Sequence, residues 1–208
     1  MMKALPLIVG VAVFLAGPVV EAQNLTPQEI DKAVAYLEQT RAGVLDATKG
    51  LSEAQWNFKP GPDRWSVAEV AEHIAAAEDL LMGLIQSQVM TAPARAEGED
   101  VKALDELIVK QIRDRSQKAQ APEPLKPTNR YGSPEKSLKH FEESRAKTIA
   151  FLKRTKDLRQ HAYNLPAMTW LNGKKLDGYQ WLLYIAAHSE RHTKQIDEVK
   201  ADPHFPKN

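Results

Sequence analysis

Four long runs with an apolar residue every three or four positions constrain the fold of this chain more than any other feature. Each run opens with a helix start signal: Thr26 precedes Pro27 and Glu29, for example, and Ser66 precedes Glu69. A Ser, Thr or Asp can cap a helix, and a Glu or Gln three residues later can complete a capping box. The predicted caps are Thr26, Ser66, Ser133 and Asp177. We therefore expect an all-α protein built as a four-helix bundle.

The connection between the second and third of these helices is long and runs from Thr91 to Arg130. Its middle, from Asp100 to Lys118, has apolar residues at helical spacing and charges elsewhere, so it predicts an additional helix on or beside the bundle. Its exit carries Pro122, Pro124 and Pro127, which predict a stiff linker. We therefore expect the bundle to carry a helical insertion over residues 91–130.

Two shorter connections also carry local signals. The stretch from Leu51 to Pro62 holds Trp56 and Phe58 among Pro and Gly residues, which is typical of a packed turn over the end of a bundle. No strand-like alternation of useful length is present, although Leu165 to Leu176 could form a short hairpin around Asn172-Gly173. These stretches add at most a small amount of other structure to a helical fold.

The first 22 residues are typical of a cleaved secretory signal peptide. A charged Lys3 precedes an apolar run from Ala4 to Val20, and Val20 and Ala22 occupy the positions that a signal peptidase reads. The alternative is a membrane anchor, but the run contains Pro and Gly and falls short of the roughly 20 apolar residues that a spanning helix needs. We expect removal of residues 1–22, leaving one domain over residues 23–208 that is periplasmic or secreted, with no membrane attachment.

Composition narrows the chemistry and the partners. Lys and Arg number 28 and Asp and Glu number 27, so the net charge is +1 and the positive charge typical of a nucleic-acid-binding protein is absent. The chain has no cysteine, which excludes disulfides, Cys-based zinc sites, iron–sulfur clusters and a cysteine nucleophile. We therefore expect no nucleic-acid partner, and a fold stabilised by its core or by a bound metal.

Three histidines are the strongest candidates for a functional site. His188 and His192 lie one helical turn apart in the apolar stripe of the fourth helix, and His73 lies in the middle of the second. If these helices pack side by side, the three imidazoles can bind one divalent metal and leave a position for water or substrate. The alternative is three histidines bonded to carbonyls or water, and spacing leaves both open. The other histidines are expected at the surface: His140, His161 and His204.

The chain resembles the DinB-like superfamily of four-helix-bundle proteins over nearly all of the expected mature domain. The matching residues are Trp56, Lys59-Pro60, the run from Arg64 to Glu69, His73, and His188-Ser189-Glu190-Arg191-His192. The resemblance implies that the three histidines bind a divalent metal, which in this family is zinc, nickel or iron. Its members include transferases that use small cytosolic thiols, an isomerase and proteins assigned as hydrolases. Export would disfavour the thiol chemistry, and the insertion over residues 91–130 departs from the compact family core.

Three functions are compatible with these features. The first is an exported metal-dependent hydrolase or transferase that activates water or a thiol for a small-molecule substrate of unknown identity. The second is a non-catalytic periplasmic protein that binds a metal or small molecule in stress or storage. The third is a metal-free structural bundle, as a homodimer through the second and fourth helices. No catalytic residue is assigned, because we expect Glu69 to cap its helix and Glu190 to point away from the histidines.

Overall fold

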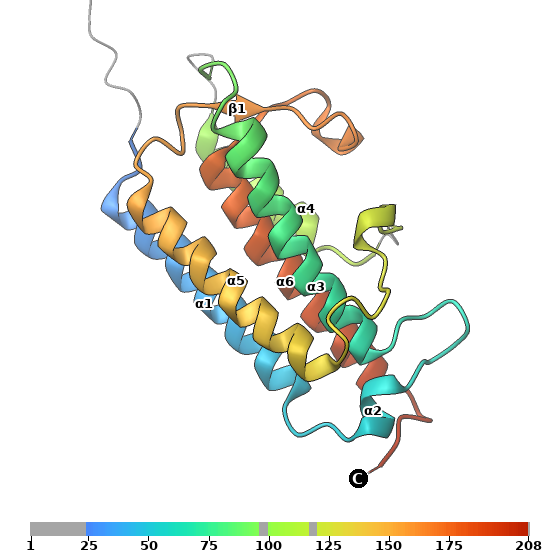
Figure 1. The fold of residues 1–208 in the computed structure, drawn as a ribbon. Helices are drawn as coiled ribbons and strands as arrows, with labels where there is room; N and C mark the ends of the chain where they lie inside the picture. Colours follow the sequence, from blue (N-terminus) through green and yellow to red (C-terminus); the bar gives the residue numbers. More distant parts are fainter. Residues whose placement is uncertain (1–23, 96–99, 117–119, 208) are drawn as a thin grey trace, which may run out of the picture.

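The computed structural model describes residues 24–95, 100–116 and 120–207, so the predicted signal peptide lies outside the described residues. The fold is helical (Figure 1). Its α-helices are α1 (Pro27–Thr48), α2 (Glu53–Asn57), α3 (Val67–Leu84), α4 (Val101–Arg113), α5 (Pro134–Arg154) and α6 (Gly178–Lys200). A π-helical turn (Ile85–Val89) continues α3, 3-10 turns lie at Glu123–Leu125 and Thr169–Leu171, and two short strands are β1 (Ala162–Tyr163) and β2 (Leu176–Asp177).

The four long helices α1, α3, α5 and α6 form the predicted bundle. Helix α1 packs beside α5 and α6, and α3 packs beside the same two helices, so α1 and α3 lie diagonally across the bundle (Figure 1). The second and fourth long helices are therefore neighbours, as the histidine hypothesis requires. None of the described helices is long and apolar enough to cross a membrane.

The predicted caps begin the four long helices. Thr26, Ser66 and Asp177 each form a complete capping box, and the Ser133 side chain accepts a hydrogen bond from the backbone N–H of Lys136. Each cap satisfies backbone N–H groups that have no partner inside the helix. The cap at Ser66 fixes where α3 begins and therefore where His73 lies, two turns further along.

The insertion packs against the bundle through its apolar stripe. Leu104, Ile108 and Ile112 of α4 are buried, and α4 lies along α6, which confirms the prediction of an additional helix beside the bundle. The Pro-rich exit, however, is more than a spacer. Leu125 is buried against Ala76 and Ala77 of α3, because its side chain covers a part of that helix that the bundle leaves open.

Of two other predictions for connecting segments, one is confirmed but incomplete and one is wrong. The stretch from Leu51 to Pro62 is a packed turn that also contains α2, which Ser52 and Gln55 start with a fourth capping box. The predicted hairpin around Asn172-Gly173 is wrong: β1 pairs antiparallel with β2 across a longer loop. Asn172 and Gly173 form a turn with positive φ inside that loop, and strands of two residues carry no alternating pattern that sequence could reveal.

A buried ion pair ties the four long helices together. The Arg145 guanidinium of α5 donates to the Glu78 carboxylate of α3 over 2.9 and 2.8 Å, and both side chains are almost fully buried. Arg145 also donates to the carbonyl of Leu37 in α1 and to the hydroxyl of Ser189 in α6. Since Ser189 follows His188 in the chain, the Arg145–Glu78 pair helps to fix the axial position of α6 relative to α3 near the histidines.

Candidate metal centre

The bundle brings the three predicted histidines together. His73 comes from α3, and His188 and His192 come from successive turns of the neighbouring α6. One ring nitrogen from each lies within 4.8 Å of the others. The Nε2 atoms of His73 and His192 are 3.2 Å apart, and the ring centroids of the three pairs are 4.4 to 5.1 Å apart. These are separations that one ion with bonds of about 2.0–2.1 Å to nitrogen can bridge after small movements.

Burial keeps these imidazoles neutral. His73 and His192 are buried, and His188 is partly exposed. Removal from water lowers the pKa of His73 below its usual value and lowers the pKa of His188 and of His192 well below it, with mutual repulsion among the rings adding to the effect on the two α6 histidines. A neutral imidazole has one nitrogen with a free lone pair, which is the form that binds a metal.

The hydrogen bond at the far side of His73 fixes which of its nitrogens carries the proton. Its Nδ1 lies 2.9 Å from the backbone carbonyl oxygen of Leu125. A carbonyl oxygen only accepts hydrogen bonds, so Nδ1–H must donate, and in the neutral ring Nε2 keeps its lone pair. Sequence reasoning missed this partner, because a main-chain carbonyl has no signature in the residue type.

The same constraint applies to His192. Its Nδ1 lies 2.8 Å from Oε1 of Gln195, and Nη1 of Arg115 donates to that same oxygen over 3.4 Å. A guanidinium has no acceptor, so the Gln195 amide must present its oxygen here, and His192 must donate from Nδ1. Sequence analysis also missed Gln195. It lies three residues after His192, on the same helix face, and this spacing could have predicted it as a partner of His192.

These two bonds leave a conflict that a cation resolves. Both Nε2 atoms carry lone pairs, and they face one another over 3.2 Å with no proton to share. Protonating one ring would relieve the repulsion, but burial lowers the pKa of both. A divalent metal accepts both lone pairs and that of His188, so the residues present fit such an ion, and a set of three neutral nitrogens is typical of zinc sites.

Aromatic side chains surround the three rings. Trp65 lies 4.9 Å from His73 between ring centroids, and Tyr184 stacks on His188 with centroids 6.1 Å apart and an interplanar angle of 14°. Burial raises the pKa of Tyr184 to about 12, so its hydroxyl stays protonated at neutral pH. The histidines therefore lie in an aromatic environment that can contact the apolar part of a small ligand.

The nearest carboxylates in sequence do not join the histidines. Glu69 completes the capping box of α3 and pairs with Lys59, and Glu190 accepts from the hydroxyl of Tyr36 and pairs with Arg113. Both placements are as expected. A hollow of about 760 Å³ lies elsewhere, beside α2 and the first turns of α3 and α5, and the three histidines do not line it.

The remaining histidines also stay outside the cluster. His204 is exposed, as expected. His140 and His161 are only partly exposed, because His140 bonds to the carboxylate of Asp79 and His161 bonds to the carbonyl of Ala92. His140 lies in α5 and His161 directly before β1, and neither belongs to the cluster of possible metal ligands.

Comparisons with known proteins agree with this fold. The sequence pattern of the DinB superfamily matches residues 36–196. Uncharacterized protein YuaE from Bacillus subtilis (strain 168) is 25% identical over 167 residues, which are 80% of this chain and 96% of that protein. YfiT from Bacillus subtilis, a solved structure described as a probable metal-dependent hydrolase with an unusual four-helix bundle topology, is 20% identical. It matches with a TM-score of 0.53 over 85% of this chain and 88% of its own.

Proposed function

Because this chain belongs to the DinB superfamily and gathers three imidazoles at one point, we propose that it is a divalent-metal-dependent enzyme of the hydrolase class. The observation that carries the proposal is the pair of Nε2 lone pairs that face one another between His73 and His192. Three neutral nitrogen ligands leave at least one coordination position for water or substrate, which is the arrangement of catalytic rather than structural zinc sites.

Each residue of the site has a distinct part in this proposal. His73, His188 and His192 hold the ion, while the Leu125 carbonyl and the Gln195 amide orient two of the rings. When bound there, a divalent metal supplies the Lewis acidity that lowers the pKa of a water or thiol ligand. Tyr184 and Trp65 offer aromatic surface to the organic part of a small-molecule substrate.

One observation favours the non-catalytic alternative. Water activation needs a proton acceptor, and both carboxylates nearest in sequence are engaged elsewhere, Glu69 with Lys59 and Glu190 with Tyr36. Among the residues that the structure describes, the cluster of possible metal ligands contains histidines only. A protein that binds a metal or small molecule without turnover is therefore the second candidate.

The first experiment asks whether the native protein holds a metal. The protein is purified without an affinity tag, its metal content is measured by mass spectrometry, and ester, amide and phosphoester hydrolysis is assayed with and without a chelator. We expect roughly one divalent ion per chain and an activity that the chelator abolishes. His73→Ala should lose both, whereas His204→Ala, at an exposed histidine, should keep both. Activity that persists in the metal-free protein would contradict the proposal.

Cobalt substitution distinguishes a metal-dependent enzyme from a protein that binds metal without catalysis. Cobalt bound by three histidines and solvent has a visible spectrum that changes when an added anion such as azide replaces the solvent. A stoichiometric cobalt site with no such change would indicate that no coordination position is open to substrate. That result would favour metal binding without catalysis.

We also propose that the chain is exported after cleavage behind Ala22. The support lies in the sequence alone: a charged start, an apolar run and small residues at the cleavage position. The test is the N-terminal sequence and cell fraction of the protein recovered from its host. Recovery of a chain that begins at Gln23 outside the cytoplasm is expected, and an intact Met1 in the cytoplasm would contradict it. Export would favour water over a cytosolic thiol as the activated group.

A further inference from the structure

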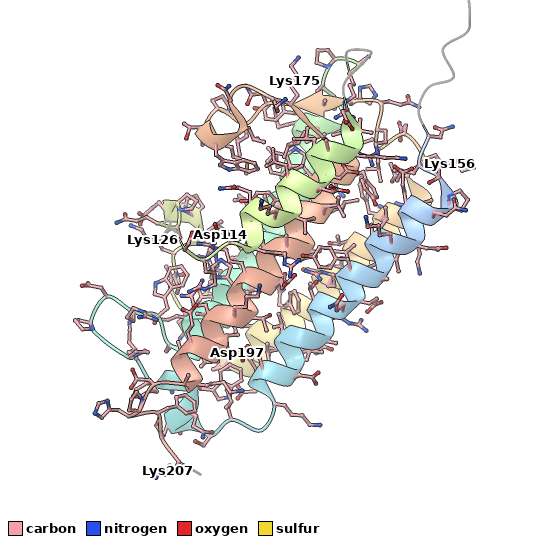
Figure 2. The ribbon with its side chains drawn as sticks, turned by 180° about the vertical axis from the view of Figure 1, so that it is seen from behind. Asp114, Lys126, Lys156, Lys175, Asp197 and Lys207 are labelled. Atoms are coloured by element: carbon pink, nitrogen blue, oxygen red, sulfur yellow. The ribbon has the colours of Figure 1, made fainter. Side chains whose placement is uncertain are left out.

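The insertion reaches the histidine cluster at two separate places. The Leu125 carbonyl, from the Pro-rich exit, accepts from Nδ1 of His73 over 2.9 Å. Arg115, from the segment that follows α4, donates to Oε1 of Gln195, which accepts from Nδ1 of His192. Lys126, which follows Leu125, lies on the side of the bundle opposite α1, as does Asp114 just after α4 (Figure 2). Two of three candidate ligands thus have an outer hydrogen bond that depends on the insertion.

The Leu125 carbonyl is held in place from both sides. The guanidinium of Arg130 donates to the carbonyls of Pro124 and Lys126, which flank Leu125, over 2.9 and 2.7 Å. Arg130 also donates to the carboxylate of Glu72, the residue before His73, over 3.0 Å. Backbone N–H groups of Thr128 and Asn129 donate to the same carboxylate. The exit of the insertion is therefore fastened to the helical turn that carries His73.

Arg115 is held in place by an ion pair with Glu198 of α6. Its Nε and Nη2 donate to the two carboxylate oxygens of Glu198 in α6 over 2.7 and 2.6 Å, which leaves Nη1 directed at Gln195. Arg191, which lies between His188 and His192 in the chain, donates to the backbone carbonyls of Ile112 and Asp114 at the end of α4. These bonds dock the end of α4 on the turn of α6 that carries both ligands.

We propose that the insertion is a positioning element of the metal centre, with Arg115 and Gln195 as positioning residues that hold His192 in the tautomer whose Nε2 faces the metal. The two side chains differ in the hydrogen bonds that they can make. Arg115 can only donate, so it turns the Gln195 oxygen toward His192, and that oxygen in turn requires Nδ1–H. Without Arg115 and Gln195, nothing described at Nδ1 of His192 would prevent the opposite tautomer, which cannot bind the metal through Nε2.

The proposal rests on the proposed metal function, and its test keeps the two apart. Gln195→Leu removes the acceptor and keeps the shape of the side chain, and Gln195→Glu restores an acceptor next to Arg115. Gln111→Leu makes the same change at an exposed position of α4 and serves as the control. In the metal-free proteins, nitrogen-15 NMR of the histidine rings reports the tautomer directly. We expect His192 protonated at Nδ1 in the wild type, in Gln195→Glu and in Gln111→Leu, and a mixture of tautomers in Gln195→Leu.

Metal affinity gives the second measurement, by competition between zinc and a chelating dye. Loss of an outer hydrogen bond to a ligand typically costs about 10- to 100-fold in affinity, so Gln195→Leu should weaken zinc binding by that factor. Gln195→Glu should bind within a few fold of the wild type, and Arg115→Gln should fall between them. Arg115 lies near the surface, so this variant should fold.

The outcomes separate the two hypotheses. A wild-type protein that binds no zinc would overturn the proposed function, while the NMR experiment would still decide the tautomer of His192. Zinc binding of equal strength in the wild type, Gln195→Leu and Arg115→Gln, with one unchanged tautomer, would overturn the positioning role and leave the metal function intact. An equal loss of affinity in Gln111→Leu would also contradict the proposal, because it would assign the effect to general destabilisation of α4.

Discussion

Arg145 is a buried charged residue that needs hydrogen-bond partners from several helices. It is fully buried, and its guanidinium bonds to groups from the other three long helices. A buried charge is tolerated only with a partner and with its remaining hydrogen bonds satisfied, and Glu78 and its neighbours provide both. A polar residue at this point therefore favours one relative placement of the helices.

Arg145→Met should lower the free energy of unfolding by about 3–5 kcal/mol, because it leaves the Glu78 carboxylate buried without its partner. The double variant Arg145→Met, Glu78→Leu should recover much of this loss, since it leaves no unpaired charge at this point of the core. Urea unfolding followed by circular dichroism measures both. A double variant as unstable as the single one would show that the hydrogen bonds matter more than the unpaired charge.

The histidines allow a prediction that needs no substrate. A ligand that binds only the native state stabilises it, by about 2.7 kcal/mol when its concentration is 100 times its Kd. Zinc should therefore raise the melting temperature of the wild type and of His204→Ala. His188→Ala removes one of three ligands and should abolish most of that rise. An equal rise in all three proteins would place the zinc elsewhere.

The capping box in the first turn of α3 contributes to the stability of that helix. The Ser66 hydroxyl accepts from the N–H of Glu69, and Glu69 accepts from the N–H of Ser66. Ser66→Ala should destabilise the protein by about 1 kcal/mol, which chemical denaturation can measure. Ser87→Ala, at an exposed serine near the other end of this helix, should change stability much less. A larger loss at Ser87 would contradict the importance given to the cap.

Features that depend on residues close together in the chain could be predicted from the sequence. The caps at Thr26 and Asp177 and the spacing of apolar residues set where helices begin and which face is buried, because both effects act within a few residues. The spacing of His188 and His192 indicated a shared face for the same reason. The small helix α2 was missed, since Pro and Gly on either side of it outweighed its own cap at Ser52.

Features that depend on distant contacts could not be predicted. Arg145 and Glu78 have the residue types of a solvated helix face, and only the packing of α5 on α3 places them in the core. The partner of His73 is a carbonyl 52 positions away, in a segment whose prolines indicated a spacer. The carbonyl that orients His73 therefore comes from a part of the chain with a weak pattern.

At the scale of the whole molecule, one cation joins three elements at the end of the bundle away from α2. The Arg159 guanidinium donates to Glu29 in α1 over 2.8 Å, to Asp105 in α4 over 2.7 Å and to Asp177, the cap of α6, over 3.0 Å. Burial by itself would raise the pKa of Glu29, but the N–H of Thr26 and the charge of Arg159 outweigh it and lower that pKa.

This shift predicts how stability depends on pH. A carboxyl group whose pKa is lower in the folded than in the unfolded protein stabilises the fold above its unfolded pKa, here about 4.5, and that contribution is lost as the pH falls through the folded value. Glu29→Gln should therefore lose stability at pH 7 and lose less than the wild type on further acidification. Glu143→Gln, at an exposed position of α5, should follow the wild-type curve. Urea unfolding between pH 7 and pH 3 tests this, and parallel curves for all three would contradict it.

The positions of His73 and His192 in the chain have a consequence for biogenesis. They are 119 residues apart, and His188 and His192 lie on α6, which follows the other three long helices of the bundle in the chain. A growing chain that has exposed only α1, α3 and α5 presents one of the three histidines, so the trio forms only after α6 has emerged and docked. Under the proposed function, the metals in supply where α6 docks would then decide which ion the site takes.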